Sequence, residues 1–248
     1  DHCTISGNGG DGVTCAGDPT FEACVVTANG GAGVLCGERA LPTLRGCTIE
    51  KNEGGGVACA SLSSPFLDTC AVVANRGDAG GGLLCTDMSA PHLTGCTIAG
   101  NYAFLGGGVY CQGAAMPYIT RTEIRGNAAV FGGGLYFESS NAELDKLTIL
   151  GNWAERDGGG IYCLDSAPLL SNFVLAGNAA RFLGGGVFAD ESSEPWLFFG
   201  TIVANSAERD GAWCSYGIEA TIGAFNSIIR ANSSTPLDGN DNLTGRDP

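Results

Sequence analysis

The chain has 248 residues, 44% of which are apolar, so its length and composition permit a folded protein with a sizeable hydrophobic core. Its 12 Lys and Arg are outnumbered by 26 Asp and Glu, and the net charge of −14 repels phosphate backbones and anionic lipid headgroups. Because no segment contains the roughly 20 consecutive apolar residues that span a bilayer, these features argue against nucleic-acid partners and against direct membrane insertion.

The first recurring feature along the chain is an asparagine that returns every 21 to 27 residues. A repeat period in the twenties is typical of a solenoid, in which each repeat contacts only its neighbours. An aliphatic residue stands three positions before each asparagine, as Ile5 does before Asn8, and we expect that column to face inward. The asparagines are Asn8, Asn29, Asn52, Asn75, Asn101, Asn127, Asn152, Asn178, Asn205 and Asn232.

A glycine-rich turn and a short apolar segment follow each asparagine except the last, as in residues 106–111. Apolar residues alternate in this segment, which predicts a strand with one buried face. A third segment usually opens with proline and carries another apolar residue two positions later. Since proline lacks a donor for the strand ladder, it belongs at a strand start. Each repeat therefore predicts three short strands and no helix.

These repeats predict an all-β protein, a parallel β-helix of about ten rungs, each with 21 to 27 residues and three short strands. Residues 1–232 are expected to form a single β-helix domain, and residues 233–248 a polar C-terminal exit segment. Neither end carries the capping unit that protects the edge strands of a solenoid. We therefore expect the chain to be a fragment of a longer protein.

The motif Cys-Thr-Ile-x-Gly-Asn, followed by Gly-Gly-Gly-Val-Tyr-Cys, resembles the right-handed parallel β-helix repeat proteins. Among these pectin-lyase-like solenoids it is most similar to the repeats of polymorphic outer-membrane proteins, and the resemblance covers nearly the whole chain. It implies an exported bacterial protein, either secreted or on the cell surface. Because such solenoids include adhesins, surface-layer components and polysaccharide-cleaving enzymes, the resemblance implies a fold rather than an activity.

We interpret the asparagine column as a structural ladder. Asparagine tolerates the left-handed backbone conformation of a tight turn, and stacked carboxamides can hydrogen-bond from one rung to the next. The alternative is a strip of carboxamides that binds a ligand.

All twelve cysteines fall in two columns, which we expect to be structural. Their spacing lacks the short pairs typical of zinc sites, and the only histidines are His2 and His92. Two interpretations remain open: free thiols stacked as small buried hydrophobes, or disulfides between at least some of them. One column contains Cys3, Cys24, Cys47, Cys70 and Cys96, and the other contains Cys15, Cys36, Cys59, Cys85, Cys111, Cys163 and Cys214.

A column of the glycine-rich strands is predicted to point outward, and five consecutive members are aromatic: Tyr110, Tyr136, Tyr162, Phe188 and Trp213. Ring packing between rungs would stiffen the sheet. Alternatively, the rings form an exposed platform for sugar rings or for the apolar surface of a partner, because exposed apolar stripes tend to mark interaction sites. These five residues are the candidate binding residues.

The turns after the later asparagines are longer, and two of them carry Glu-Arg-Asp, at residues 155–157 and 208–210. Solvated surface charge is the simplest interpretation, with bound Ca²⁺ or sugar contacts as alternatives. No other cofactor is implied. The sequence offers no recurrent carboxylate pair, and Lys51 and Lys146 are its only lysines, so it lacks the catalytic clusters of polysaccharide lyases and hydrolases.

The leading functional hypothesis is a non-enzymatic extracellular or cell-surface β-solenoid with a structural or adhesive role. It would present repeated faces to a surface protein, a glycan or neighbouring copies. The alternative is a carbohydrate-active enzyme, either a lyase or a hydrolase, or a glycan-binding module that uses the aromatic column.

Overall fold

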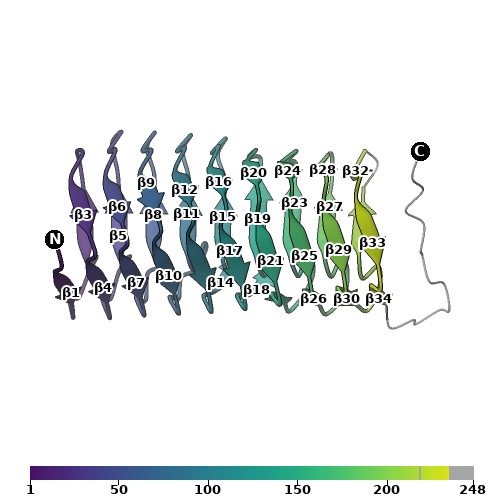
Figure 1. Ribbon diagram of the computed structural model, residues 1–248, viewed down its shortest axis with the longest axis horizontal. Coiled ribbons are helices and arrows are strands. Elements are labelled where there is room, and N and C mark those ends of the chain that lie inside the picture. Colours follow the sequence, from purple (N-terminus) through teal and green to yellow (C-terminus); the bar gives the residue numbers. More distant parts are fainter. Residues whose placement is uncertain (218, 235–248) are drawn as a thin grey trace.

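The computed structural model describes residues 1–217 and 219–234, and every regular element in that part of the chain is a β-strand. No helix there is long and apolar enough to cross a bilayer. The strands pair in parallel into four sheets, named A to D here, with ten, nine, nine and six strands. Figure 1 shows successive rungs side by side along a rod, in chain order.

Each strand has only two to four residues. Sheet A contains β1 (Thr4–Ser6), β4 (Val25–Thr27), β7 (Thr48–Glu50), β10 (Ala71–Val73), β13 (Thr97–Ala99), β17 (Glu123–Arg125), β21 (Thr148–Leu150), β25 (Val174–Ala176), β29 (Thr201–Val203) and β33 (Ile228–Arg230). Sheet B contains β2 (Val13–Cys15), β5 (Val34–Cys36), β8 (Val57–Cys59), β11 (Leu83–Cys85), β15 (Val109–Cys111), β19 (Leu135–Glu138), β23 (Ile161–Leu164), β27 (Val187–Asp190) and β31 (Trp213–Tyr216).

The other two sheets complete the rungs. Sheet C contains β3 (Thr20–Glu22), β6 (Thr43–Arg45), β9 (Phe66–Asp68), β12 (His92–Thr94), β16 (Tyr118–Thr120), β20 (Glu143–Asp145), β24 (Leu169–Ser171), β28 (Trp196–Phe198) and β32 (Gly223–Phe225). Sheet D contains β14 (Tyr102–Leu105), β18 (Ala128–Phe131), β22 (Trp153–Ala154), β26 (Ala179–Ala180), β30 (Ser206–Ala207) and β34 (Ser233–Ser234).

The register places equivalent residues of successive rungs directly beside one another. In sheet A Val26 pairs with Ile49, and in sheet B Cys36 pairs with Cys59. The predicted parallel β-helix is therefore confirmed. Its rung count differs slightly from the expected ten, because sheets B and C have nine strands each.

Sheet D is a fourth strand layer that the sequence pattern did not predict. Its strands form in the longer turns that follow the ladder asparagines from Asn101 onward. The last of them, β34, pairs with β30, so Ser233 and Ser234 belong to the solenoid rather than to the exit segment expected at 233–248. Residues 235–248 of that segment lie outside the described residues.

A continuous apolar core fills the inside of the rod. The aliphatic column before the asparagines supplies fully buried residues such as Ile49 and Ile98, and sheet C supplies Leu67 and Leu197. Burial of a side chain of this size contributes about 1.5–3 kcal/mol. This contribution recurs on every rung and explains how such short strands hold together.

The glycine triplets before the sheet B strands are required by the close approach of the next rung. A Cβ atom on Gly134 would lie 2.5 Å from the carbonyl oxygen of Gly160, and one on Gly160 would lie 2.6 Å from that of Gly186. Any side chain at these positions would force neighbouring rungs apart. The repeated Gly-Gly-Gly therefore reflects stacking between rungs as well as turn formation.

In the turns that leave sheet A, the residue before the ladder asparagine has the left-handed backbone conformation. Lys51, Ala74 and Gly100 have φ values of 55°, 54° and 63°. The expectation that the asparagine itself adopts the left-handed conformation is therefore wrong. The asparagine is needed instead for the hydrogen bonds of its side chain, described below.

Replacement of Ala74 by glycine is expected to raise the free energy of unfolding by about 0.5–1 kcal/mol. The left-handed conformation is strained for alanine, while the greater freedom of glycine in the unfolded chain offsets part of the gain. Urea unfolding measures the difference. The matched control, Ala71→Gly within β10, should lower stability, and a loss of stability in both variants would contradict the assignment of strain to position 74.

Candidate functional site

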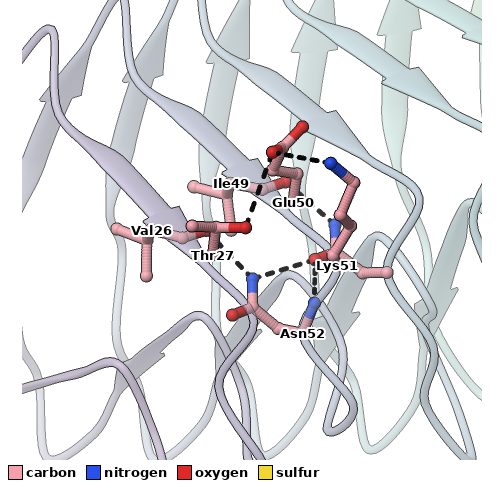
Figure 2. Close-up of polar contacts among 7 residues, drawn as sticks. Val26, Thr27, Ile49, Glu50, Lys51 and Asn52 are labelled. Carbon is pink, nitrogen blue, oxygen red and sulfur yellow. Dashed lines mark hydrogen bonds and ion pairs between the residues drawn. The ribbon is translucent and has the colours of Figure 1, made fainter. Parts of the chain in front are cut away.

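The asparagine ladder runs along the turns that leave sheet A. Asn52 donates through Nδ2 to Oδ1 of Asn75 over 2.9 Å and to the carbonyl oxygen of Val26 over 3.2 Å. Its Oδ1 accepts the backbone N–H and the Nδ2–H of Asn29, over 3.1 and 2.9 Å. Figure 2 shows Asn52 turned toward Val26, with Glu50 on the outside between Thr27 and Lys51.

The same four hydrogen bonds recur from rung to rung, for example at Asn127. The ladder asparagines from Asn29 to Asn205 are buried. Each of these carboxamides uses both donors and accepts two hydrogen bonds, so the predicted hydrogen-bonded ladder is present. No part of these side chains is left to face a ligand.

The cysteines are free thiols. In sheet B, Cys85 pairs in register with Cys111, and both side chains are fully buried. Desolvation, together with a hydrogen bond between the two thiols, raises the pKa of Cys85 well above its ordinary value, and desolvation alone raises that of Cys163. These thiols stay protonated and pack as small apolar groups.

The last strand of sheet B is shifted by one residue from the predicted columns. Trp213 pairs with Val187 and Cys214 pairs with Phe188. Trp213 therefore does not continue the aromatic column, and Cys214 does not continue the cysteine column. The reason is that Ala212 stands in the position of the third glycine, equivalent to Gly186, so the strand begins one residue later than predicted.

The aromatic column of sheet B is buried. Tyr110, Tyr136, Tyr162 and Phe188 are only 3–7% exposed and form a second core. Leu105, Phe131 and Leu183 from the long turns pack over them. The rings of Tyr136 and Tyr162 are stacked, with centroids 4.5 Å apart and planes 3° from parallel. The column does point away from the main core as predicted, but the exposed platform is wrong because these turns cover it.

The hydroxyl groups of this second core reach carboxylates at its margin. Tyr110 donates to Glu138, and Tyr162 donates to Asp190 over 3.2 Å. Desolvation, reinforced by the negative charge of these carboxylates, raises the pKa of both tyrosines far above the ordinary value. The phenols therefore remain neutral hydrogen-bond donors.

In the Glu-Arg-Asp turn at residues 155–157, Asp157 and Arg156 are engaged by neighbouring groups. Asp157 is half-buried, which raises its pKa, and its carboxylate accepts the backbone N–H of Leu183 over 2.9 Å. Arg156 lies over the ring of Phe131, 5.7 Å from its centroid. Within residues 1–217 and 219–234, no three His, Cys, Asp or Glu side chains gather into a metal-binding group.

Exposed aromatic side chains lie on the outer face of sheet C instead. Seven residues that directly follow a proline lie in equivalent outward positions there, and the first two are Thr20 and Thr43. We name the other five the post-proline column, in which Glu143 separates Tyr118 from Leu169: Phe66, His92, Tyr118, Leu169 and Trp196. Tyr118 and Trp196 are 37% and 39% exposed. The pattern was readable in the sequence, because these residues stand between the proline and the inward residue of the strand.

Part of this face is organised by ring stacking. Trp196 and Phe225 have centroids 5.7 Å apart and planes 13° from parallel, and Phe198 stacks on Phe225 at 5.2 Å and 17°. On other rungs, the ring centroids of His92 and Tyr118 lie 5.6 Å apart. The rings are therefore positioned by one another as well as by the sheet.

Two cations near this face are paired with carboxylates. Arg45 lies 3.7 Å from Glu22, and Nζ of Lys146 lies 2.7 Å from Asp145. Hydrogen bonds from Lys146, and then from Asn172, lower the pKa of Asp145 to about 2. Asp145 is therefore ionised throughout the physiological range.

Comparison with known protein families agrees with this architecture. The model of a family described as "Right handed beta helix region" matches residues 1–127, just over half of the 248 residues. Searches of curated proteins and of solved structures gave no match. The rungs after residue 127 continue the same sheets in the same register. The chain therefore belongs to the right-handed β-helix family.

Proposed function

We propose that this protein is a non-enzymatic extracellular or cell-surface β-solenoid that holds a partner against the outer face of sheet C. The observation that carries the proposal is the post-proline column, in which Phe66, Tyr118, Leu169 and Trp196 are each more than a third exposed. Exposed apolar stripes on a regular surface tend to mark interaction sites. The stacked rungs make this stripe a long, rigid binding surface.

The interior favours a structural rather than a catalytic role. The ladder carboxamides use their hydrogen bonds on one another, and the buried thiols and phenols are held in their neutral forms. These buried groups thus contribute to stability. We therefore expect the outer surface of the rod to carry the function. In a solenoid each rung contacts only its neighbours, so this surface extends along the whole stack.

A glycan-binding module is the second candidate, favoured by the exposed Tyr118 and Trp196, since aromatic rings bind sugars through their faces. The stacking of Trp196 with Phe225 and Phe198 argues for a protein partner instead. Rings that stack on each other leave mainly their edges for a partner. Ring edges suit contact with apolar side chains better than stacking with a sugar ring.

The proposal is tested with the double variant Tyr118→Thr/Trp196→Thr. A matched control is Tyr102→Thr/Trp153→Thr, which removes the same two residue types from sheet D at similar exposures of 36% and 43%. Beads coated with each protein are assayed for adhesion to cells of the source organism, and each protein is tested for self-association by sedimentation. We expect the sheet C variant to lose one of these activities and the control to keep both.

An enzyme assay and a glycan array complete the test. Release of reducing ends or unsaturated sugars from any polysaccharide by the unmodified protein would overturn the non-enzymatic proposal. Equal adhesion and self-association of the two double variants would show that sheet C is not the binding face. Binding to neutral oligosaccharides that is lost only in the sheet C variant would replace the protein partner by a glycan.

A further inference from the structure

The edge of the rod between sheets B and C is strongly acidic. The turns that join the two sheets carry exposed carboxylates on several rungs, and Arg39 is the only cation of these turns within residues 1–217 and 219–234. We call this set the acidic edge: Asp18, Glu38, Asp87, Asp165, Glu191, Glu194 and Glu219.

This acidic edge is continuous with the post-proline column. Glu194 precedes Trp196 by two residues, separated only by the buried Pro195, so both side chains lie on the outer surface of the same segment. On another rung Met116 stands in the position equivalent to Glu194 and is 64% exposed beside Tyr118. Met88 in a neighbouring turn is 58% exposed. The surface thus combines fixed negative charge with exposed apolar side chains.

Apart from Arg39 in these turns and Arg121 directly after β16, the cations beside sheet C in the described part of the chain are paired with carboxylates. Arg45 and Lys146, which border sheet C, are paired with Glu22 and Asp145. Arg156 and Arg181 lie over rings at the sheet D turns, beyond the opposite margin of sheet B. Within the described residues, the turns between sheets A and B carry five cations among their carboxylates, whereas the turns between sheets B and C carry only Arg39. The more negative of these two edges is therefore the one that adjoins the post-proline column.

From this arrangement we infer that the partner of sheet C is a basic protein segment in which Lys or Arg alternates with apolar residues. This inference rests on the proposed function and specifies its partner. The apolar side chains of the segment would contact the post-proline column while its cations face the acidic edge, because complementary charge raises the rate and the specificity of association. A second copy of this chain fits less well, since two molecules of net charge −14 repel each other.

The test uses synthetic peptides of about 12 residues, which are about 40 Å long when extended and therefore span about eight rungs spaced about 4.8 Å apart. The first alternates Lys with Leu, the second alternates Glu with Leu, and the third alternates Lys with Ser. Fluorescence anisotropy with the whole protein should detect binding of the Lys-Leu peptide alone. Its affinity should fall about tenfold or more between about 50 and about 500 mM NaCl, because salt screens exposed charges.

Two isosteric triple variants locate the charge effect. Asp165→Asn/Glu191→Gln/Glu194→Gln neutralises part of the acidic edge, and Glu53→Gln/Glu155→Gln/Glu208→Gln removes the same charge from the turns after the ladder asparagines. The first should weaken binding of the Lys-Leu peptide about threefold to thirtyfold, as expected from three exposed ion pairs. The second should change it less than twofold, within the scatter of such measurements.

Equal weakening by the two triple variants would overturn the inference, because net charge alone would then explain the binding. Binding of the Glu-Leu peptide as tight as that of the Lys-Leu peptide would also overturn it. Failure of the proposed function would look different. In that case Tyr118→Thr/Trp196→Thr would leave bead adhesion, self-association and peptide binding unchanged, whatever the charge of the peptide.

Discussion

Replacement of Asn101 by alanine is expected to lower the free energy of unfolding by about 3–6 kcal/mol. The substitution removes the acceptor of both the backbone N–H and the Nδ2–H of Asn75, and it removes the donor to the carbonyl oxygen of Val72. All these groups are buried in the ladder, so water cannot replace the lost partner. A buried polar group without a partner costs about 1–3 kcal/mol.

Urea unfolding followed by circular dichroism measures this effect. The matched control is Asn141→Ala, an exposed asparagine whose Oδ1 accepts one backbone hydrogen bond from Ala167 over 2.7 Å. Because water can replace that bond, the control should lose about 1 kcal/mol or less. A loss at position 101 no larger than that of the control would show that the ladder contributes little to stability.

Replacement of Tyr136 by threonine is expected to cost about 3–5 kcal/mol, the range for removal of a buried aromatic side chain. Its ring lies between those of Tyr110 and Tyr162, at 5.3 and 4.5 Å, beneath the turns of sheet D. Threonine is a good strand former, so the loss reports the cavity rather than the backbone. The same change at Tyr118, exposed on sheet C, is the control and should cost less than about 1 kcal/mol.

Thermal unfolding of the two tyrosine variants discriminates a covered column from an exposed one. If the column of sheet B were open to solvent, the two substitutions would have similar small effects. A second variant tests the cover without removing a ring of the column. Phe131→Ser removes part of the cover and should increase the binding of a hydrophobic dye to the folded protein.

The sequence was sufficient for the fold because stacking makes each structural requirement recur. One inward aliphatic residue, such as Ile49 or Ile98, and one ladder asparagine are needed on every rung, so their spacing reveals the coil directly. Glycine recurs for the same reason, since Gly134 and Gly160 each face the backbone of the following rung. A contact that repeats along the axis leaves a periodic trace in the sequence.

The candidate site could not be predicted in the same way, because exposure depends on what the turns do. Alternation along the strand shows that Tyr136 points away from the main core, but not that Phe131 and Leu183 from the long turns pack over that column. Those turns differ in length and composition from rung to rung and carry no simple period. The outward position of a residue such as Trp196 follows from the sequence, because it stands next to the inward Leu197. Its exposure does not, because that depends on whether a turn covers the sheet.

The ladder also gives the rod a net dipole along its axis. From Asn29 to Asn205, each Nδ2 donates to the Oδ1 of the asparagine on the following rung, so the amide dipoles of the side chains point the same way along the axis. Dipoles aligned head to tail polarise one another and strengthen each hydrogen bond in the series. The column therefore acts as one cooperative unit that runs at right angles to the strands. A reversed rung would place donor against donor at one end of the column, or acceptor against acceptor at the other.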